Sequence, residues 1–379
     1  MIKKFDLIVF GAGLFGTHTA LHFSRKGKRV LLVEREERDA AWAKASLVNQ
    51  ARVHSGHHYP RSIKTALMAL DHRERFIREQ RDIINGQFKA YYAIDRYGSL
   101  TDAQQFARFC RKVGIQHRQV ERSDLFSRDR IEALFEADEL SFDPLLLRKR
   151  YTSALSESSV STEYGTNLLA AGKTGNIWSM TLQSPNGTKK CFETPSVINA
   201  TYAAINSINS AFGVPAIEAT HELSEIVLVH VPFLADVGLT VMDGPFVSIM
   251  PFGVSGLHSL SSVLYTHRAY CSAGAPSFPC QQGRDDCHPS AVAVCSRCPV
   301  KPSTNARKMV RQLGHYLNYP DQIYVHGSLH TVKTKLTSAL ADDGRPTDIR
   351  IHSQSPFFAS VFSGKVNSVY EVENIEISD

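Results

Sequence analysis

Residues 5–34 read FDLIVFGAGLFGTHTALHFSRKGKRVLLVE, and this stretch decides the fold class. The apolar run at 5–10 predicts a buried strand, and residues 14–25 predict a helix that Gly27 ends. A second apolar run at 29–33 predicts another strand. A strand, a glycine-rich turn, a helix and a second strand in this order predict an α/β fold that opens with a βαβ unit.

The turn between the first strand and the helix contains Gly11, Gly13 and Gly16. Gly11 permits the tight turn, Gly13 lets a pyrophosphate approach the backbone, and Gly16 lets the helix pack close to the strand. The helix N-terminus offers free N–H groups to the phosphates. Glu34 lies 18 residues after Gly16, where a carboxylate can bind a ribose diol and repel a 2′-phosphate. We therefore expect a bound dinucleotide other than NADP, with a tight turn that binds nothing as the alternative.

Length and composition limit the class of protein. The chain has 379 residues, 43% of them hydrophobic and 21% charged, which allows a large core and two domains. No apolar run reaches the length of a membrane span, and the N-terminus lacks the apolar core of a secretory signal, so we expect a cytoplasmic protein. The net charge of +6 is scattered, as on the mixed-charge segment at 73–82, so we expect no nucleic-acid partner.

The segment after Glu34 distinguishes FAD from NAD. An NAD-type domain continues with regular βα units, whereas residues 35–62 are polar, aromatic and glycine-containing. They lack the pattern of a buried parallel strand and indicate a loop wrapped around a ligand. This pattern favours FAD, with an NAD-dependent oxidoreductase as the alternative.

One group of residues in this loop resembles a known family. The residues are Asn49, Val53, His54, Ser55, Gly56, Tyr59, Ser62 and Lys64. Their spacing resembles that of the FAD-dependent oxidoreductases of the D-amino-acid oxidase superfamily, and most closely the L-2-hydroxyglutarate oxidase-like branch. In this superfamily the segment runs past the flavin ring system.

The resemblance implies a Rossmann-like (GR2-type) FAD-binding domain that is discontinuous in sequence. Its expected pieces are residues 1–85, 140–205 and 340–379. The expected substrate domain consists of a helical excursion at 86–139 and an inserted antiparallel sheet with a helix at 206–339. This sheet would cover the flavin.

Three later stretches resemble the family's cofactor contacts. Residues 159–168 resemble the strand that meets the adenine, residues 196–206 the strand under the pyrophosphate, and residues 363–370 the turn near the flavin pyrimidine. The predicted FAD contacts are Gly11, Gly13, Leu14, Phe15, Gly16, Glu34, Arg35, Ser46, Asn49, Gln50, Ala51, Arg52, Leu168, Ala200, Thr201, Gly364, Lys365, Val366 and Asn367.

The resemblance also implies that the flavin carries out the redox step while the protein orients the substrate. We expect oxidation of a C–N or C–O bond in a small polar metabolite (an amino acid, amine, hydroxy acid or sugar derivative) by hydride transfer to flavin N5. The electron acceptor would be O₂ or a carrier such as a quinone or a protein. A tailoring role in biosynthesis fits this reaction. A non-catalytic FAD-fold module with a metal-binding loop is a further alternative.

Oxidation of a carbinol or an amine also releases a proton, which a histidine can accept near neutral pH. His54 is the first candidate for this base because it matches the family's histidine. His57 and His58 are further candidates, with Tyr59 as a donor. A neutral histidine that only bonds flavin or backbone, or one attached covalently to FAD, remains an open alternative.

A carboxylate on the substrate needs a cationic partner. Arg52, Arg345 and Lys365 are the candidates, since each lies in a segment expected near the flavin. Together with the candidates for the base, the predicted catalytic residues are His54, His57, Tyr59 and Arg345.

Seven cysteines occur, and five of them fall between residues 271 and 298. The Gly, Ser, Pro and charged residues around them predict a loop, which a metal or a crosslink can order. A reducing compartment favours the metal, so we expect a structural Zn²⁺ bound by Cys280, Cys287, Cys295 and Cys298. An iron–sulfur cluster, disulfides and free thiols are the alternatives.

Overall fold

The structure is a computed structural model that describes residues 2–339 and 346–377. A six-stranded sheet contains the predicted βαβ unit, in the order β10-β3-β2-β14-β22-β21. Neighbouring strands are parallel, except that β21 pairs antiparallel with β22. The bounds are Leu7–Phe10 (β2), Val30–Val33 (β3), Ser161–Glu163 (β10), Ser196–Asn199 (β14), Asp348–Gln354 (β21) and Phe357–Phe362 (β22).

Helix α1 (Leu14–Arg25) has the bounds that the sequence predicts. A Cβ on Gly16 would lie 1.7 Å from the carbonyl oxygen of Gly11, so only glycine permits this close packing of helix and turn. Every residue of β2 and β3 is buried, which explains their continuous apolar sequence. Helix α5 (Pro144–Ser156) and the 3₁₀-helix η8 (Val366–Asn374) pack against α1.

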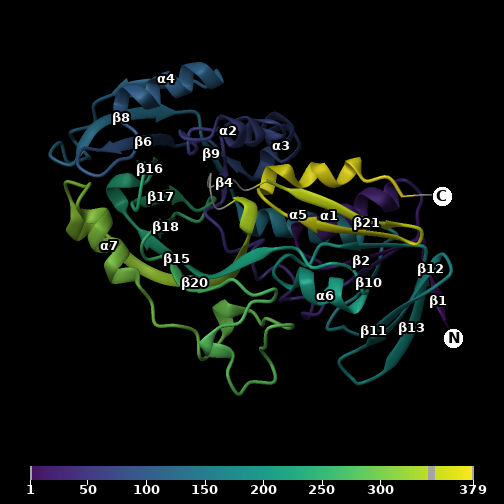
Figure 1. The fold of residues 1–379 in the computed structure, drawn as a ribbon. Helices are drawn as coiled ribbons and strands as arrows, with labels where there is room; N and C mark the ends of the chain where they lie inside the picture. Colours follow the sequence, from purple (N-terminus) through teal and green to yellow (C-terminus); the bar gives the residue numbers. More distant parts are fainter. Residues whose placement is uncertain (1, 340–345, 378–379) are drawn as a thin grey trace.

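A nine-stranded sheet forms the second large part of the molecule (Figure 1). Its order is β19-β15-β18-β17-β16-β6-β8-β7, and β20 also pairs with β15. Helix α7 (Ala306–Gly314) packs against β17 and β18, inside the segment 206–339 where the sequence predicts an antiparallel sheet with a helix. The bounds are Lys89–Asp95 (β6), His117–Val120 (β7), Ile131–Ala137 (β8), Ala219–His230 (β15), Val237–Met242 (β16), Val247–Pro251 (β17), His258–Ser262 (β18), His267–Cys271 (β19) and Tyr324–Leu336 (β20).

The expectation of a helical excursion at 86–139 is wrong. This segment contains α4 (Ala103–Val113), but β6, β7 and β8 join the nine-stranded sheet. Strand β6 is buried at every residue after Lys89, so it lacks the alternation of a half-exposed strand. Its partner β16 is parallel and lies far away in sequence, and no local pattern predicts that pairing.

Two smaller sheets complete the structure, in the orders β1-β13-β12-β11 and β4-β9-β5. Their bounds are Lys3–Lys4 (β1), Arg52–Val53 (β4), Ile84–Asn85 (β5), Leu140–Phe142 (β9), Asn167–Thr174 (β11), Ile177–Gln183 (β12) and Lys189–Thr194 (β13). The remaining α-helices are Ile63–Leu70 (α2), Arg73–Glu79 (α3) and Ile205–Ala211 (α6).

The fold is the predicted α/β type, with a Rossmann-like part and a mostly antiparallel part. All strands of the six-stranded sheet come from 1–85, 140–205 and 340–379, and all strands of the nine-stranded sheet come from 86–139 and 206–339. This distribution supports the two-part division, whose boundaries stay a prediction. Within the described ranges, none of the helices has the length and apolar character needed to span a bilayer.

Candidate functional site

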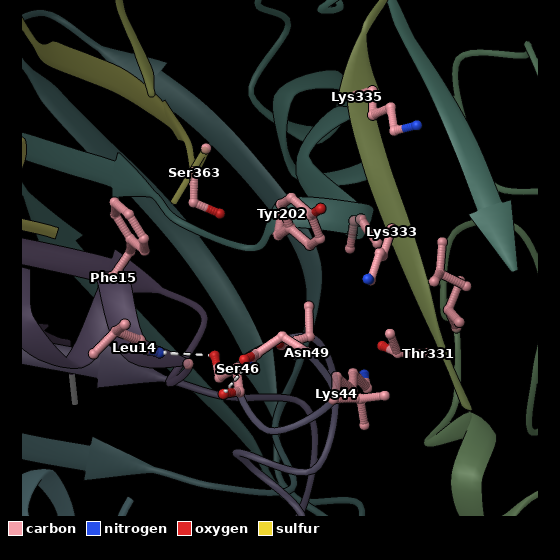
Figure 2. A pocket seen from close by; sticks show the side chains of 18 of the residues that line it. Leu14, Phe15, Lys44, Ser46, Asn49, Tyr202, Thr331, Lys333, Lys335 and Ser363 are labelled. Carbon is pink, nitrogen blue, oxygen red and sulfur yellow. Dashed lines mark hydrogen bonds between the residues drawn. The ribbon is translucent and has the colours of Figure 1, made fainter. Parts of the chain in front are cut away.

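A cavity of about 1360 Å³ is lined by residues from both large sheets. The six-stranded part contributes the glycine turn, the end of β3 and the residues after β14. The nine-stranded part contributes residues of β16, β17 and β20, including Thr331 and Lys333 (Figure 2). The loop at 45–54 forms a further wall of the same cavity, as the sequence predicts for a segment wrapped around a ligand.

The glycine turn presents the N-terminus of α1 to this cavity. Gly13, Leu14 and Phe15 line it, and Gly13 as N-cap has no side chain that could block the first turn. A Cβ on Gly13 would lie 2.9 Å from Ser46 Oγ, so a side chain would fill the space in front of the helix. An open helix N-terminus behind a bare backbone fits a pyrophosphate.

Glu34 lies at the end of β3, next to the turn. Its Oε2 accepts the backbone N–H of Ala12 at 2.7 Å, and its Oε1 accepts the N–H of Glu36 at 2.9 Å. These bonds fix the carboxylate in the cavity wall, where it can accept hydrogen bonds from a ribose. The neighbouring Arg35 pairs with Glu36 at 2.6 Å and donates to the carbonyl of Val292 in the segment at 271–298 that contains five cysteines, here called the cysteine-rich loop.

Most of the predicted FAD contacts line this one cavity. They are Gly11, Gly13, Leu14, Phe15, Glu34, Arg35, Ser46, Asn49, Gln50, Ala51, Arg52, Leu168, Ala200, Thr201, Gly364, Lys365 and Val366. Gly16 does not line it, because its role is the packing of α1 on the turn. Asn367 does not line it either, since its amide donates to the carbonyl of Ala69 at 3.0 Å. The shape, the open helix end and the carboxylate together fit FAD.

His54 lines the cavity and is tied to a buried acid. Its Nδ1 lies 3.3 Å from Oε1 of Glu139, whose side chain is fully buried. Burial lowers the pKa of His54, although Glu139 opposes this effect. The ring is therefore neutral at pH 7, which is the form that accepts a proton.

Tyr59 and Lys365 lie together in the same wall, next to His54. The ammonium of Lys365 lies 4.7 Å from the centre of the Tyr59 ring, and it donates to the carbonyl of Thr65 at 3.4 Å. The rings of His54 and Tyr59 lie 5.8 Å apart. A cation, a phenol and a neutral imidazole thus face one region of the cavity.

His57 does not belong to this wall. It is buried outside the cavity, with Nδ1 2.8 Å from Ser55 Oγ and Nε2 2.7 Å from the carbonyl oxygen of Gln116. Both ring nitrogens are therefore engaged, and the expectation of a catalytic His57 is not supported. His58, the next residue, does line the cavity.

Arg52 and Arg345 are the other two candidates for binding a substrate carboxylate. Arg52 lines the cavity, but its guanidinium pairs with Glu139 at 3.2 Å and donates to Ser248 Oγ. A substrate carboxylate would have to compete with a buried ion pair. Arg345 lies outside the described residues.

The predicted zinc site is not supported. In the part of the chain that the structure describes, no group of three or more His, Cys, Asp or Glu side chains is arranged to hold a metal ion. Cys280, Cys287, Cys295 and Cys298 have free thiols. Burial, together with the neighbouring Cys287 and Cys280, raises the pKa of Cys295 to about 12. The loop instead packs on the segment after β3, through Val294 against Ala40 and Ala43.

Sequence reasoning missed Glu139, Ser248 and the lysines of the opposite wall. Glu139 follows β8 in a segment with other acids, and nothing local distinguishes it. Lys333 and Lys335 alternate along β20 and line the cavity, with Lys335 paired to Glu222 at 2.7 Å. The alternation of Lys333 and Lys335 with period two, which is typical of a strand, was the available signal for these lysines.

The comparisons with known proteins agree with this geometry. Residues 6–253 match the family described as FAD dependent oxidoreductase, DAO. A protein of Fusarium mangiferae, named FAD-dependent monooxygenase FPY4, is 25% identical over 376 residues, which cover 97% of this chain and 89% of that protein.

Solved structures share the fold at low identity. Glycine oxidase from Geobacillus kaustophilus has a TM-score of 0.69 and 12% identity, covering 98% of this chain and 92% of its own. Reduced L-α-glycerophosphate oxidase from Mycoplasma pneumoniae, with FAD bound, has a TM-score of 0.70 and 13% identity, covering 98% and 93%.

The fold and the cavity define the class of flavin-dependent oxidoreductases. The chain belongs to the DAO family of FAD-dependent oxidoreductases, because the family match spans well over half of its length. It is therefore an oxidoreductase that uses FAD.

Proposed function

We propose that this protein oxidises a C–N or C–O bond of a small polar metabolite that carries a carboxylate. The single observation that carries the proposal is the grouping of His54, Tyr59 and Lys365 in one cavity wall. The group combines a neutral base with a cation, which are the two functions that oxidation of an amino or hydroxy acid requires. Bound FAD supplies the hydride acceptor, at its N5.

His54 has the role of the base in this proposal. Its lowered pKa keeps it neutral, so it can take the proton from the hydroxyl or amine nitrogen of the substrate. The substrate carbon can then lose its hydrogen as a hydride, and the product is a carbonyl compound or an imine. Tyr59, whose ring lies 5.3 Å from that of His58, can donate a hydrogen bond to the substrate.

Lys365 has the role of the carboxylate partner. Its side chain is nearly buried, so an ion pair with a substrate is little screened by water. The carbonyl of Thr65 orients the ammonium from behind. We propose Lys365 for this role because it faces the same region of the cavity as His54 and Tyr59.

The resemblance to the L-2-hydroxyglutarate oxidase-like branch points to a 2-hydroxy acid, and the similarity to glycine oxidase points to an amino acid. The Fusarium mangiferae relative carries the name of a monooxygenase. A monooxygenase in which a nicotinamide cofactor reduces the flavin is therefore a second candidate.

Flavin absorbance under anaerobic conditions tests these candidates. The FAD-loaded protein is mixed in turn with L-2-hydroxyglutarate, glycine, L-proline, glycerol 3-phosphate, NADH and NADPH. We expect either the 2-hydroxy acid or one of the amino acids to bleach the flavin. The Lys365→Met variant should need about 10- to 100-fold more of that acid to bleach the flavin equally fast, because it has lost a bond to a charged group. Bleaching by NADPH alone would instead favour the monooxygenase. Equal acid requirements in wild type and Lys365→Met would remove Lys365 from the site.

A further inference from the structure

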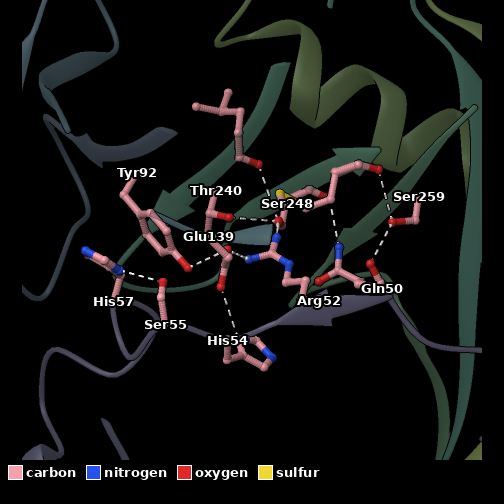
Figure 3. A network of polar contacts seen from close by, with 12 residues as sticks. Gln50, Arg52, His54, Ser55, His57, Tyr92, Glu139, Thr240, Ser248 and Ser259 are labelled. Atoms are coloured by element: carbon pink, nitrogen blue, oxygen red, sulfur yellow. Dashed lines mark hydrogen bonds and ion pairs between the residues drawn. The ribbon is translucent and has the colours of Figure 1, made fainter. Parts of the chain in front are cut away.

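Glu139 lies behind the cavity wall, in the turn between β8 and β9, and its side chain is fully buried. One carboxylate oxygen, Oε2, accepts the Tyr92 hydroxyl at 2.9 Å and Arg52 Nη1 at 3.2 Å (Figure 3). A buried carboxylate is costly unless it is paired and hydrogen-bonded, and these two partners meet that requirement.

The other oxygen, Oε1, has a different environment. It lies 3.3 Å from Nδ1 of His54, which is within ion-pair distance, and in the described part of the chain neither atom has a hydrogen-bond partner. Both atoms are buried, whereas the exposed fifth of the His54 side chain lines the cavity. Glu139 therefore has one oxygen that the fold holds in place and one that faces His54.

The held oxygen is fixed from separate parts of the molecule. Tyr92 lies on β6, and Arg52 lies on β4 and donates in addition to Ser248 Oγ on β17. Ser248 Oγ in turn lies 3.1 Å from the hydroxyl of Thr240 on β16. This network sets the direction of the Glu139 carboxylate without any contribution from the His54 side chain.

We propose that Glu139 is a positioning residue that selects the tautomer of His54. The carboxylate accepts a hydrogen bond from Nδ1–H, so the proton stays on Nδ1 and the lone pair on Nε2 is directed at the cavity. Without this acceptor the proton can sit on Nε2, and the imidazole then presents a donor where the reaction needs a base. The inference rests on the proposed role of His54 in the reaction.

The charges around His54 agree with this assignment. Glu139 favours the charged ring, whereas Arg52 and Lys365 disfavour it, and burial disfavours it most. His58 and Tyr59 also face the ring, at centroid distances of 5.8 Å each. Burial alone would raise the pKa of Glu139, but Arg52 and His54 outweigh burial and hold that pKa well below its usual range. The carboxylate is therefore ionised and able to accept a hydrogen bond from Nδ1–H at neutral pH.

The direct test is the tautomer itself, measured by NMR of the FAD-loaded protein with ¹⁵N-labelled histidine. Comparison with His54→Ala identifies the His54 signals. We expect wild-type His54 to carry its proton on Nδ1. In Glu139→Gln we expect the Nε2–H form to appear and the His54 pKa to fall, because the nearby negative charge is gone. Glu136→Gln is the matched control on the solvent side of β8, where the carboxylate pairs with Lys89.

A kinetic cycle adds a second readout, with the acid of the panel above that bleaches the flavin fastest. We expect Glu139→Gln to slow flavin reduction on the order of 10- to 100-fold and to move the acid limb of its pH profile to lower pH. In the His54→Ala background, Glu139→Gln should not slow flavin reduction any further, because Glu139 acts only through His54.

The outcomes separate this inference from the proposed function. Unchanged reduction in His54→Ala would overturn the base itself. If His54→Ala reduces the flavin slowly, two results would overturn only the positioning role of Glu139. One is an unchanged His54 tautomer in Glu139→Gln. The other is that Glu139→Gln slows flavin reduction equally in the wild-type and His54→Ala backgrounds. If Glu139→Gln does not fold, the wild-type spectrum decides, since a proton on Nε2 contradicts the proposal.

Discussion

The hydroxyl oxygen of Ser46 accepts the backbone N–H of Leu14 at 3.0 Å. This bond ties the loop after β3 to the first turn of α1, and a Cβ on Gly13 would meet the same oxygen at 2.9 Å. The helix end, the loop and the bare glycine backbone thus meet at one point of the cavity wall. The pyrophosphate of FAD is expected at this point.

Gly13→Ala should weaken FAD binding about 10- to 100-fold, as the usual cost of an overpacked site implies. The added methyl group meets Ser46 Oγ and fills the space in front of α1. Flavin absorbance after titration of the FAD-depleted protein measures the change. Gly172→Ala is the control, because nothing lies within 4 Å of the Cβ position there. Equal FAD affinity in both variants would place the pyrophosphate elsewhere.

Glu34→Gln should raise the Kd for FAD about 10- to 100-fold, since a hydrogen bond to a charged group contributes about 1.5–3 kcal/mol. The carboxylate is held toward the cavity by Ala12 and Glu36, so the ribose meets a fixed acceptor. Glu163→Gln is a matched control one strand away, where the acid pairs with Lys190 at 2.9 Å. Isothermal titration of FAD into both variants makes the measurement. Equal affinities would mean that Glu34 serves only the turn.

The sequence predicted the βαβ unit because its determinants are local. Apolar runs, three glycines and one acid lie within residues 5–34, and each element touches the next along the chain. The strands β6, β7 and β8 were missed for the opposite reason. Their order in the sheet depends on the parallel pairing of β6 with β16, for which the intervening chain gives no short-range signal.

The candidate site likewise has residues that the local sequence predicted and residues that it could not predict. His54 and Tyr59 lie in one short motif, and the structure brings them into one wall with Lys365 from the C-terminal segment. The acid behind them could not be predicted, because Glu139 is one of several acids near β8 and burial alone distinguishes it. His57 shows the converse, since its place in the motif predicted a catalytic role, whereas the structure buries it outside the cavity with its ring nitrogens near Ser55 and Gln116.

Acid should destabilise the folded protein, in part through His221. This buried ring has its pKa lowered from 6.5 to about 4 by burial, so the unfolded chain binds a proton that the folded chain excludes. The contribution is fully present above about pH 6.5 and is lost as the pH falls towards 4, at no more than about 1.4 kcal/mol per pH unit.

Urea unfolding at pH 7, 6 and 5 measures this dependence. In His221→Gln the free energy of unfolding should fall less steeply with decreasing pH than in wild type. The exposed His230→Gln variant should keep the wild-type slope, because that side chain is solvated in both states. Identical slopes for His221→Gln and wild type would mean that folding does not lower the pKa of His221.

The cysteine-rich loop should control how long FAD stays bound. Asp285, Asp286 and the residues from Ser290 to Ala293 line the cavity, and the loop is anchored through Val294 and the Arg35 bond to Val292. In Val294→Asp a charge would be buried against Ala40 and Ala43, so the loop should detach at its anchor.

We expect FAD to dissociate about 10-fold faster from Val294→Asp. A decrease of about 1.4 kcal/mol in the free energy that holds the loop closed corresponds to that factor. The fluorescence of released flavin after dilution follows the rate. Val300→Asp introduces the same charge in the same region at a half-exposed position, and it should dissociate like wild type. If Val294→Asp also released FAD at the wild-type rate, the loop would line the cavity without closing it. FAD would then leave by a path that does not require the loop to open.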